Sequence, residues 1–135
     1  KERIEYLTEK LRLKELLNRV TGELSSGQKN RASLAKALIN KPKVLFLDEP
    51  TASLDPEIGD FVRSFLENYK KENKISILLA SHNMNEVSRL CKSVLMMKDG
   101  IIIDQGTPEF LIEKHGRRNL EEVFLKLSRS ENEFN

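Results

Sequence analysis

The sequence predicts an α/β fold built on a parallel sheet with flanking helices. Residues 44–47 and 75–80 are short apolar runs, and such runs are typical of strands buried on both faces of a parallel sheet. Between them lies a strong helix start, with Asp55 as the N-cap and Pro56 at the first helical position. Strands and helices that alternate along the chain are the pattern of α/β proteins.

Helices are also predicted on either side of the first strand. Residues 1–20 are mostly charged and carry leucines at roughly helical spacing, which favours one or two helices with an apolar face. Residues 21–28 form a polar break, and a helix is expected over 28–40, where Pro42 ends it. The helix capped by Asp55 continues through one apolar stripe, made of Ile58, Phe61, Val62, Phe65, Leu66 and Tyr69.

The last third of the chain predicts a hairpin flanked by helices. Asp99 and Gly100 form a tight-turn signal between two apolar runs, residues 93–98 and 101–105. One short helix is expected before the hairpin and two helices after it. The first has Asn83 as a possible cap, followed by Met84, Val87 and Leu90. The second starts at Thr107 and Pro108 and stops at Gly116. The third starts at a capping pair, Asn119 and Glu122, and carries an apolar stripe made of Leu120, Val123, Phe124 and Leu127.

Composition narrows the class of protein. Of the 135 residues, 39% are hydrophobic, which is enough for a packed core. The 23 Lys and Arg against 21 Asp and Glu leave a net charge of +2. Because proteins that bind the phosphate backbone carry a clear basic excess, we expect no nucleic-acid partner. No apolar stretch approaches the roughly 20 residues of a membrane span. Cys91 is the only cysteine, so a reducing compartment fits best.

Two carboxylates directly follow the first predicted strand. Ligands of open α/β sheets bind at the carboxyl ends of the strands, and Asp48 and Glu49 come at that point of the chain. Adjacent carboxylates there can divide the work, one acting toward a Mg²⁺ ion and the other toward a water molecule. A solvated strand end has the same residues, so this motif alone leaves both interpretations open.

Two further motifs stand where a phosphate could bind. Residues 24–28, Leu-Ser-Ser-Gly-Gln, precede a helix, and serine hydroxyls and free backbone N–H groups at a helix N-terminus attract anions. His82 follows the second predicted strand, where an imidazole can contact a γ-phosphate or position a water molecule. Each motif also has a structural explanation, a capped loop for the first and a structural histidine for the second.

The ordered set of motifs resembles that of ATP-binding cassette (ABC) ATPases. Residues 24–28 resemble the signature motif, 44–51 the Walker B motif and the residues after it, 53–55 (Ser-Leu-Asp) the D-loop, and His82 the switch histidine. The order and the spacings are also similar to those of the family. The resemblance runs from about residue 13 to the end of the chain.

The resemblance implies a partial P-loop NTPase (RecA-like) parallel sheet with helices, together with part of the ABC helical subdomain. Asp48 would hold Mg²⁺ through water, Glu49 would be the general base, and His82 would contact the γ-phosphate of ATP. In a head-to-tail dimer, ATP held by the opposite subunit would be covered by Ser25, Ser26, Gly27 and Gln28. Asp55 would also act across the dimer interface.

The same resemblance divides the chain. Residues 1–40 would be the end of the helical subdomain with the signature loop and the helix after it, 41–118 the C-terminal part of the RecA-like core, and 119–135 a terminal helix and tail. The sequence contains no Gly-Lys dipeptide, so it lacks the phosphate-binding loop of such proteins. We therefore expect a truncated or proteolytic piece of a longer protein, with exposed apolar area and negligible ATPase activity by itself.

The resemblance implies that the parent protein hydrolyses ATP to drive transport, with ATP and Mg²⁺ as cofactors. Its partners would be a second nucleotide-binding domain, identical or different, and transmembrane permease subunits. These subunits would hold it peripherally at the cytoplasmic face of the cell membrane. Residues 119–127 resemble the ending of exporter-type cassettes, such as multidrug ATPases, although an importer or a cofactor or lipid exporter also fits.

Two other functions stay open. A soluble cassette ATPase, such as a translation factor or a chromosome-maintenance protein, is disfavoured because translation factors of the superfamily usually carry Asn-His where Ala52 and Ser53 stand. The sequence also lacks the heptad array that chromosome-type ATPases usually have. A non-catalytic regulatory cassette is disfavoured because Glu49 and His82 are intact.

Overall fold

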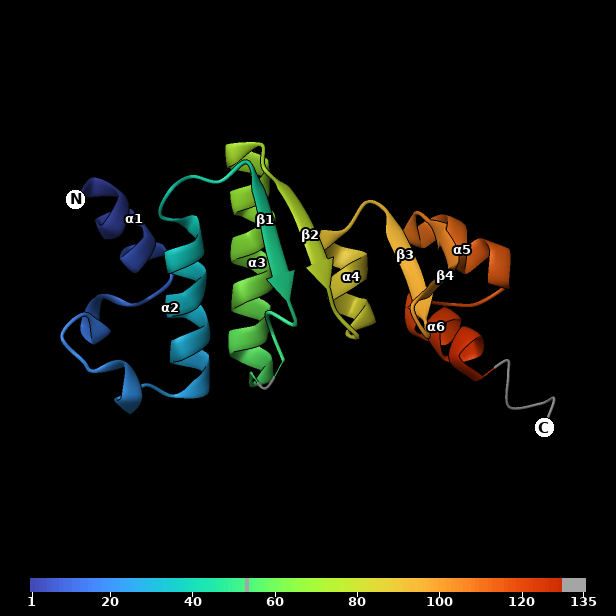
Figure 1. Ribbon diagram of the computed structural model, residues 1–135, viewed down its shortest axis with the longest axis horizontal. Helices are drawn as coiled ribbons and strands as arrows, with labels where there is room; N and C mark the ends of the chain where they lie inside the picture. The colour runs from blue at the N-terminus through green and yellow to red at the C-terminus, as the bar shows by residue number, and fades with distance from the viewer. Residues whose placement is uncertain (53, 130–135) are drawn as a thin grey trace. The chain divides into compact units, whose positions relative to one another are not determined.

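The computed structural model describes residues 1–52 and 54–129 and divides the chain into two compact units (Figure 1). The first unit is Lys1–Ala80 and the second is Ser81–Asn135. Ser53 of the predicted D-loop and residues 130–135 of the predicted tail lie outside the described residues. Within the described part, no helix is long and apolar enough to cross a membrane.

The first unit begins with the predicted N-terminal helices. Helix α1 (Glu2–Lys10) and two short 3₁₀ turns, η1 (Lys14–Leu16) and η2 (Thr21–Glu23), precede helix α2 (Ser26–Leu38). The apolar face expected for residues 1–20 is confirmed at Leu7 and Leu11, which are buried, and is wrong at Leu17 and Val20, which are exposed. In α2, Leu34 and Leu38 are buried as expected. Helix α2 begins at Ser26 rather than at the predicted Gln28, since Ser25 caps it.

Arg3 fastens α1 to two other helices of this unit. Its Nη2 donates hydrogen bonds to the carbonyl oxygen of Leu38, at 2.8 Å, and to the hydroxyl of Tyr69. The guanidinium also lies 5.3 Å from the ring centre of Tyr6 and 5.4 Å from that of Tyr69, within the range of cation–π attraction. One side chain therefore joins α1, the end of α2 and the helix that carries Tyr69.

The parallel sheet is present, and the described residues contribute two strands to it. Strand β1 (Val44–Asp48) pairs in parallel with strand β2 (Ser76–Ala80), and helix α3 (Pro56–Asn73) connects them. The predicted start of α3 is confirmed, because Asp55 Oδ1 accepts a hydrogen bond from the backbone N–H of Ile58 at 3.0 Å. The helix ends at Lys74, which has a left-handed φ of 51°.

The prediction that both strands are buried on both faces is wrong for the described residues. Phe46 and Leu78 are partners in the strand register, yet they are 73% and 59% exposed. Leu45, whose side chain points to the other face, is buried, and α3 runs beside the two strands (Figure 1). Among the described residues only one face of this sheet is covered, so the open face forms part of the exposed apolar area that was expected.

The second unit contains the predicted hairpin between helices. Helix α4 (Met84–Leu90) is capped by Asn83, as expected. Strands β3 (Val94–Lys98) and β4 (Ile101–Gly106) pair antiparallel, with an irregularity between Met96 and Met97. Asp99 and Gly100 have φ values of 49° and 77°, and two consecutive positive φ angles are typical of the type I′ turn of tight hairpins.

Two helices complete this unit. Helix α5 (Pro108–His115) is capped by Thr107 and ends at Gly116, and helix α6 (Leu120–Arg129) follows. Asn119 accepts from the backbone N–H of Glu122, while the carboxylate of Glu122 accepts from the backbone N–H of Arg118. The expected stripe is buried at its first two positions and half-buried at the others: Leu120, Val123, Phe124 and Leu127.

Candidate functional site

The carboxylate pair lies at the carboxyl end of the parallel sheet. Asp48 is the last residue of β1 and is exposed, whereas Glu49 is half-buried. Glu49 has a left-handed φ of 47° and donates its backbone N–H to the carbonyl oxygen of Ala80 at 2.8 Å. A positive φ is uncommon outside glycine and is enriched at functional sites. This bond anchors the carboxylate turn, which is the turn at Asp48 and Glu49 that ends β1, to the end of β2.

The surroundings of Asp48 restrict the metal site that it could form. The described residues contain no group of three or more His, Cys, Asp and Glu side chains that could hold a metal ion. Mg²⁺ commonly keeps several waters and binds proteins through one or two carboxylates plus substrate phosphates. Asp48 is an exposed carboxylate at a strand end, and carboxylate oxygens are ligands of the kind that Mg²⁺ accepts.

The predicted signature loop forms a complete helix cap. Ser25 Oγ accepts from the backbone N–H of Gln28 at 3.2 Å, and Gln28 Oε1 accepts from the backbone N–H of Ser25 at 2.9 Å. Ser26 and Gly27 take the first two positions of α2, where helix geometry provides no acceptor for the backbone N–H groups. The capped-loop interpretation is therefore confirmed, and it leaves two N–H groups at a helix N-terminus suited to an anion.

The start of α2 lies beside the start of α3. A Cβ atom at Gly27 would be 3.6 Å from Leu54 Cδ2 and 3.7 Å from Ile58 Cγ2, which is ordinary van der Waals contact. Asp55, between these two residues in sequence, caps α3. The structure therefore brings the predicted signature loop next to the described part of the predicted D-loop.

Arg31 supports this arrangement one helical turn after Gly27. Its Nη1 donates to the carbonyl oxygens of Leu11 at 3.0 Å and Arg12 at 3.2 Å, which holds the chain that precedes α2 against the helix. Burial, and then the positive charge of Arg12, lowers the pKa of Arg31, while the charge of Asp55 acts in the opposite direction. The Arg31 guanidinium therefore lies within the electrostatic field of Asp55.

Asn30 is a positioning residue that the sequence analysis missed. Its Nδ2 donates to the carbonyl oxygen of Pro50 at 2.7 Å and so ties α2 to the residue directly after Glu49. Helix α2 and the carboxylate turn are thus joined by a direct hydrogen bond. The partners are 20 residues apart in sequence, and no local pattern signals such a bond.

His82 lies in the second unit and is exposed. Its two neighbours in sequence, Ser81 and Asn83, are hydrogen-bonded to each other: the Ser81 hydroxyl accepts from the backbone N–H of Asn83 at 3.1 Å. The same hydroxyl donates to Glu86 Oε2 at 2.7 Å. The imidazole is therefore presented from an ordered turn before α4. Because Asp48 and Glu49 belong to the first unit, the predicted convergence of these three side chains stays a prediction.

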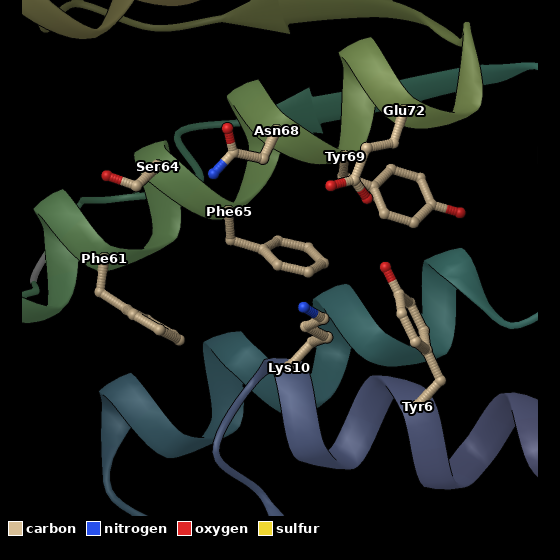
Figure 2. Close-up of a pocket in the computed structure, with 8 residues that line it drawn as sticks. All are labelled: Tyr6, Lys10, Phe61, Ser64, Phe65, Asn68, Tyr69 and Glu72. Carbon is tan, nitrogen blue, oxygen red and sulfur yellow. The ribbon is translucent and has the colours of Figure 1, made fainter.

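A pocket of about 210 Å³ lies elsewhere in the first unit, between α1 and α3 (Figure 2). Aromatic side chains dominate its wall, with charged groups from both helices. None of the predicted site residues lines it, so it is distinct from the carboxylate turn and the signature loop. Its lining residues are Tyr6, Lys10, Phe61, Ser64, Phe65, Asn68, Tyr69 and Glu72.

Comparison with known proteins identifies the family. Residues 1–52 match the family described as ABC transporter. The ABC transporter ATP-binding protein NatA of Bacillus subtilis is 37% identical over 125 residues, which cover 93% of this chain and 50% of NatA. These matches identify the chain as sequence of an ABC transporter nucleotide-binding domain. The predicted α/β fold with a partial P-loop NTPase sheet is confirmed by a solved structure: the ATP-binding cassette MJ1267 of an ABC transporter matches with a TM-score of 0.73 and 29% identity, covering 84% of this chain and 44% of that chain.

Further relatives of this ABC domain agree with that assignment. Methionine import ATP-binding protein MetN 1 of Bacillus cereus is 43% identical over 111 residues, covering 79% of this chain and 32% of that protein. The structure of cbiO1 from Clostridium perfringens matches with a TM-score of 0.71 and 37% identity, covering 95% of this chain and 50% of that one. The chain spans half or less of these proteins, and the resemblance to exporters is not confirmed.

Proposed function

We propose that the protein to which this ABC domain belongs hydrolyses ATP at the interface of a head-to-tail dimer of nucleotide-binding domains. The observation that carries the proposal is the anchored turn at Asp48 and Glu49, where the backbone N–H of Glu49 bonds to Ala80 at the end of β2. In a parallel sheet, the carboxyl ends of the strands are where ligands bind. The hydrolysis drives transport through transmembrane permease subunits, which hold the protein at the cytoplasmic face of the membrane.

In this proposal the two carboxylates have separate tasks. Asp48 holds Mg²⁺ through water, and the ion neutralises phosphate charge when it is bound with ATP. Glu49 accepts a proton from the attacking water, a contribution typically worth about 10²–10⁴-fold in rate. Phosphoryl transfer depends mainly on positioning, and the hydrogen bonds from Glu49 to Ala80 and from Asn30 to Pro50 restrain the turn on both sides of the carboxylate.

His82 takes the γ-phosphate contact in the same proposal. It follows Ala80, the residue that anchors Glu49, by only two positions, so the covalent chain limits how far His82 lies from Ala80. The imidazole either donates a hydrogen bond to a phosphate oxygen or accepts one from the attacking water. Its place in the turn before α4 supports this role, since Ser81 and Asn83 hold that turn.

The signature loop acts on nucleotide bound by the opposite subunit. The side chains of Ser25 and Gln28 are engaged in capping α2, so they present the loop to the nucleotide. The hydroxyl of Ser26 and the backbone N–H groups of Ser26 and Gly27 then contact the phosphates, helped by the positive end of the helix dipole. Asp55, at the adjacent start of α3, works across the dimer interface.

Replacement of Glu49 by glutamine in the full-length protein tests the catalytic part. We expect Glu49→Gln to reduce ATP turnover by about 10²–10⁴-fold while ATP binding is retained, because the amide keeps the shape but cannot accept the proton. Glu109→Gln is the matched control, since Glu109 is an exposed residue of α5 in the other unit. Steady-state ATPase assays and ATP-binding measurements on both variants and the wild-type protein test whether Glu49 is the general base. Wild-type turnover in Glu49→Gln would remove Glu49 from this role.

The transport part needs a separate experiment. If permease subunits are partners, affinity purification of the full-length protein from detergent-solubilised membranes recovers an integral membrane protein in fixed stoichiometry. Turnover without any such partner would instead favour a soluble cassette ATPase. Absence of ATP hydrolysis by the wild-type full-length protein would favour the non-catalytic regulatory cassette.

A further inference from the structure

Glu86 is a buried side chain of α4 beside the turn that presents His82. It lies in the first turn of the helix and is only 1% exposed. Acidic side chains are almost never fully buried without a partner. The Oε2 atom of Glu86 accepts a hydrogen bond from the hydroxyl of Ser81 at 2.7 Å. The buried glutamate is therefore linked to the residue directly before His82.

The hydroxyl of Ser81 closes that turn around His82. Its Oγ accepts from the backbone N–H of Asn83 at 3.1 Å, so the bond spans two residues with His82 between them. Serine hydroxyls that bond to the backbone two residues further on make turns of this kind. A hydroxyl has one proton and two lone pairs. Because the proton is donated to Glu86, a lone pair is left to accept from Asn83, and Glu86 thereby fixes the direction of the hydroxyl.

Asn83 ties the other side of His82 to the same glutamate. Its Oδ1 accepts from the backbone N–H groups of Asn85 at 3.1 Å and Glu86 at 3.2 Å. One neighbour of His82 thus bonds to the side chain of Glu86, and the other bonds to its backbone. A substitution of Glu86 removes the side-chain bond and keeps the backbone bond, so the contribution of the side chain to the turn can be measured.

We propose that Glu86 is a positioning residue that, through Ser81, holds the imidazole of His82 where it contacts the γ-phosphate of ATP. This role rests on the proposed function, in which His82 acts on the nucleotide. Because Glu86 is enclosed by protein, it acts on the reaction through the turn and not by contact with the nucleotide. Phosphoryl transfer depends mainly on positioning, and a misplacement of about 1 Å can cost about 10²-fold in rate.

A purely structural role for Glu86 predicts a different result. A glutamate that only stabilised α4 would lower the melting temperature when replaced, yet the molecules that remained folded would hydrolyse ATP at the wild-type rate. A residue that positions a contact made in the transition state instead lowers kcat of the folded protein and leaves the KM for ATP nearly unchanged. Turnover of the folded protein therefore distinguishes the two roles.

Steady-state ATPase assays of the full-length protein, with melting temperatures measured in parallel, test this distinction. We expect Glu86→Ala to lower kcat by about 10–100-fold, with a KM for ATP within about two-fold of the wild-type value. Glu86→Gln keeps an acceptor oxygen for Ser81, so its kcat should stay within about three-fold of wild type. Val87→Ala is the stability control, because Val87 is the next residue of α4 and is buried but has no polar side-chain atom. It should lower the melting temperature while kcat is retained.

Ser81→Ala removes the same hydrogen bond from its other end, so it tests the bond even if Glu86→Ala does not fold. It should lower kcat by a similar factor, and the two substitutions together should cost no more than either alone. Wild-type kcat in Ser81→Ala or in folded Glu86→Ala overturns the proposal. Full multiplication of the two effects in the double variant overturns it as well, and so does an equal loss of kcat in Val87→Ala.

His82→Ala separates this positioning role from the proposed function. We expect His82→Ala to lower kcat at least as much as Glu86→Ala does. Glu86→Ala added to it should change the residual kcat by less than about two-fold, because the glutamate acts through the imidazole. If it instead lowers kcat by the same factor as in the wild-type background, the positioning role is wrong while the role of His82 stands. Wild-type turnover in His82→Ala overturns both.

Discussion

The two sheets that the described residues form differ in how far apart in sequence their paired strands lie. Strands β3 and β4 are separated only by Asp99 and Gly100, whose positive φ angles make the turn. Strands β1 and β2 are separated by the whole of α3, and one face of their sheet carries exposed Phe46 and Leu78. A hairpin can be specified by its turn, whereas a parallel pair needs a crossover that packs against it.

This difference bears on the candidate site. The carboxylate turn at Asp48 and Glu49 belongs to the parallel pair, and its anchor on Ala80 exists only when α3 has brought β2 alongside β1. The hairpin carries none of the predicted site residues. Local sequence signals are therefore strongest in the hairpin, while the chemistry depends on contacts between distant segments.

The largest effect on stability is expected from the helix that joins the parallel strands. Leu66 of α3 is fully buried, so Leu66→Ala should lower the free energy of unfolding by about 2–5 kcal/mol, because it leaves a cavity. Phe46→Ala on the open face should change it by only about 0.5 kcal/mol or less, as is usual for exposed positions. Urea denaturation of both variants measures the contrast. A similar loss for Phe46→Ala would mean that the open face is covered.

An intermediate effect is expected at the hairpin turn. Gly100 has a φ of 77°, so Gly100→Ala should cost about 1 kcal/mol through backbone strain, although nothing lies within 4 Å of the added Cβ. Gly22→Ala is the matched control, because it is equally uncrowded and its φ does not lie in the left-handed region. Thermal unfolding compares the two variants. Equal melting temperatures would show that the turn does not specify the hairpin.

The smallest effect is expected from the acid titration of Asp104 in strand β4 of the hairpin. Its pKa is lowered from 3.8 to about 2 in the folded protein, so the stability it contributes is present above about pH 4 and is lost as pH falls toward 2. After allowance for solvent screening, the loss is on the order of 1 kcal/mol. Urea unfolding at pH 6 and near pH 2.5 measures it. Asp104→Asn should show a correspondingly smaller drop, and an identical drop would contradict the assignment.

The candidate site was predictable in part, for reasons that the individual residues make clear. The caps at Ser25, Asp55 and Asn83 follow from short-range hydrogen bonds, and the structure contains all three. The bond from Asn30 to Pro50 was not predictable, because nothing in either segment signals the other. The left-handed conformation of Glu49 was also missed, since glutamate has no special preference for it.

By itself, the sequence determined the starts of α3, α4 and α5, the hairpin turn and the order of motifs that resembles an ABC nucleotide-binding domain. These features depend on residues within a few positions of one another, whose hydrogen bonds and φ preferences act locally. Only the tertiary structure decided that one face of the β1–β2 sheet stays open, that Gly27 lies beside Leu54, and that Asp104 is enclosed by Lys114 and His115. Burial and ion pairing are set by which segments pack together, and local patterns do not encode that packing.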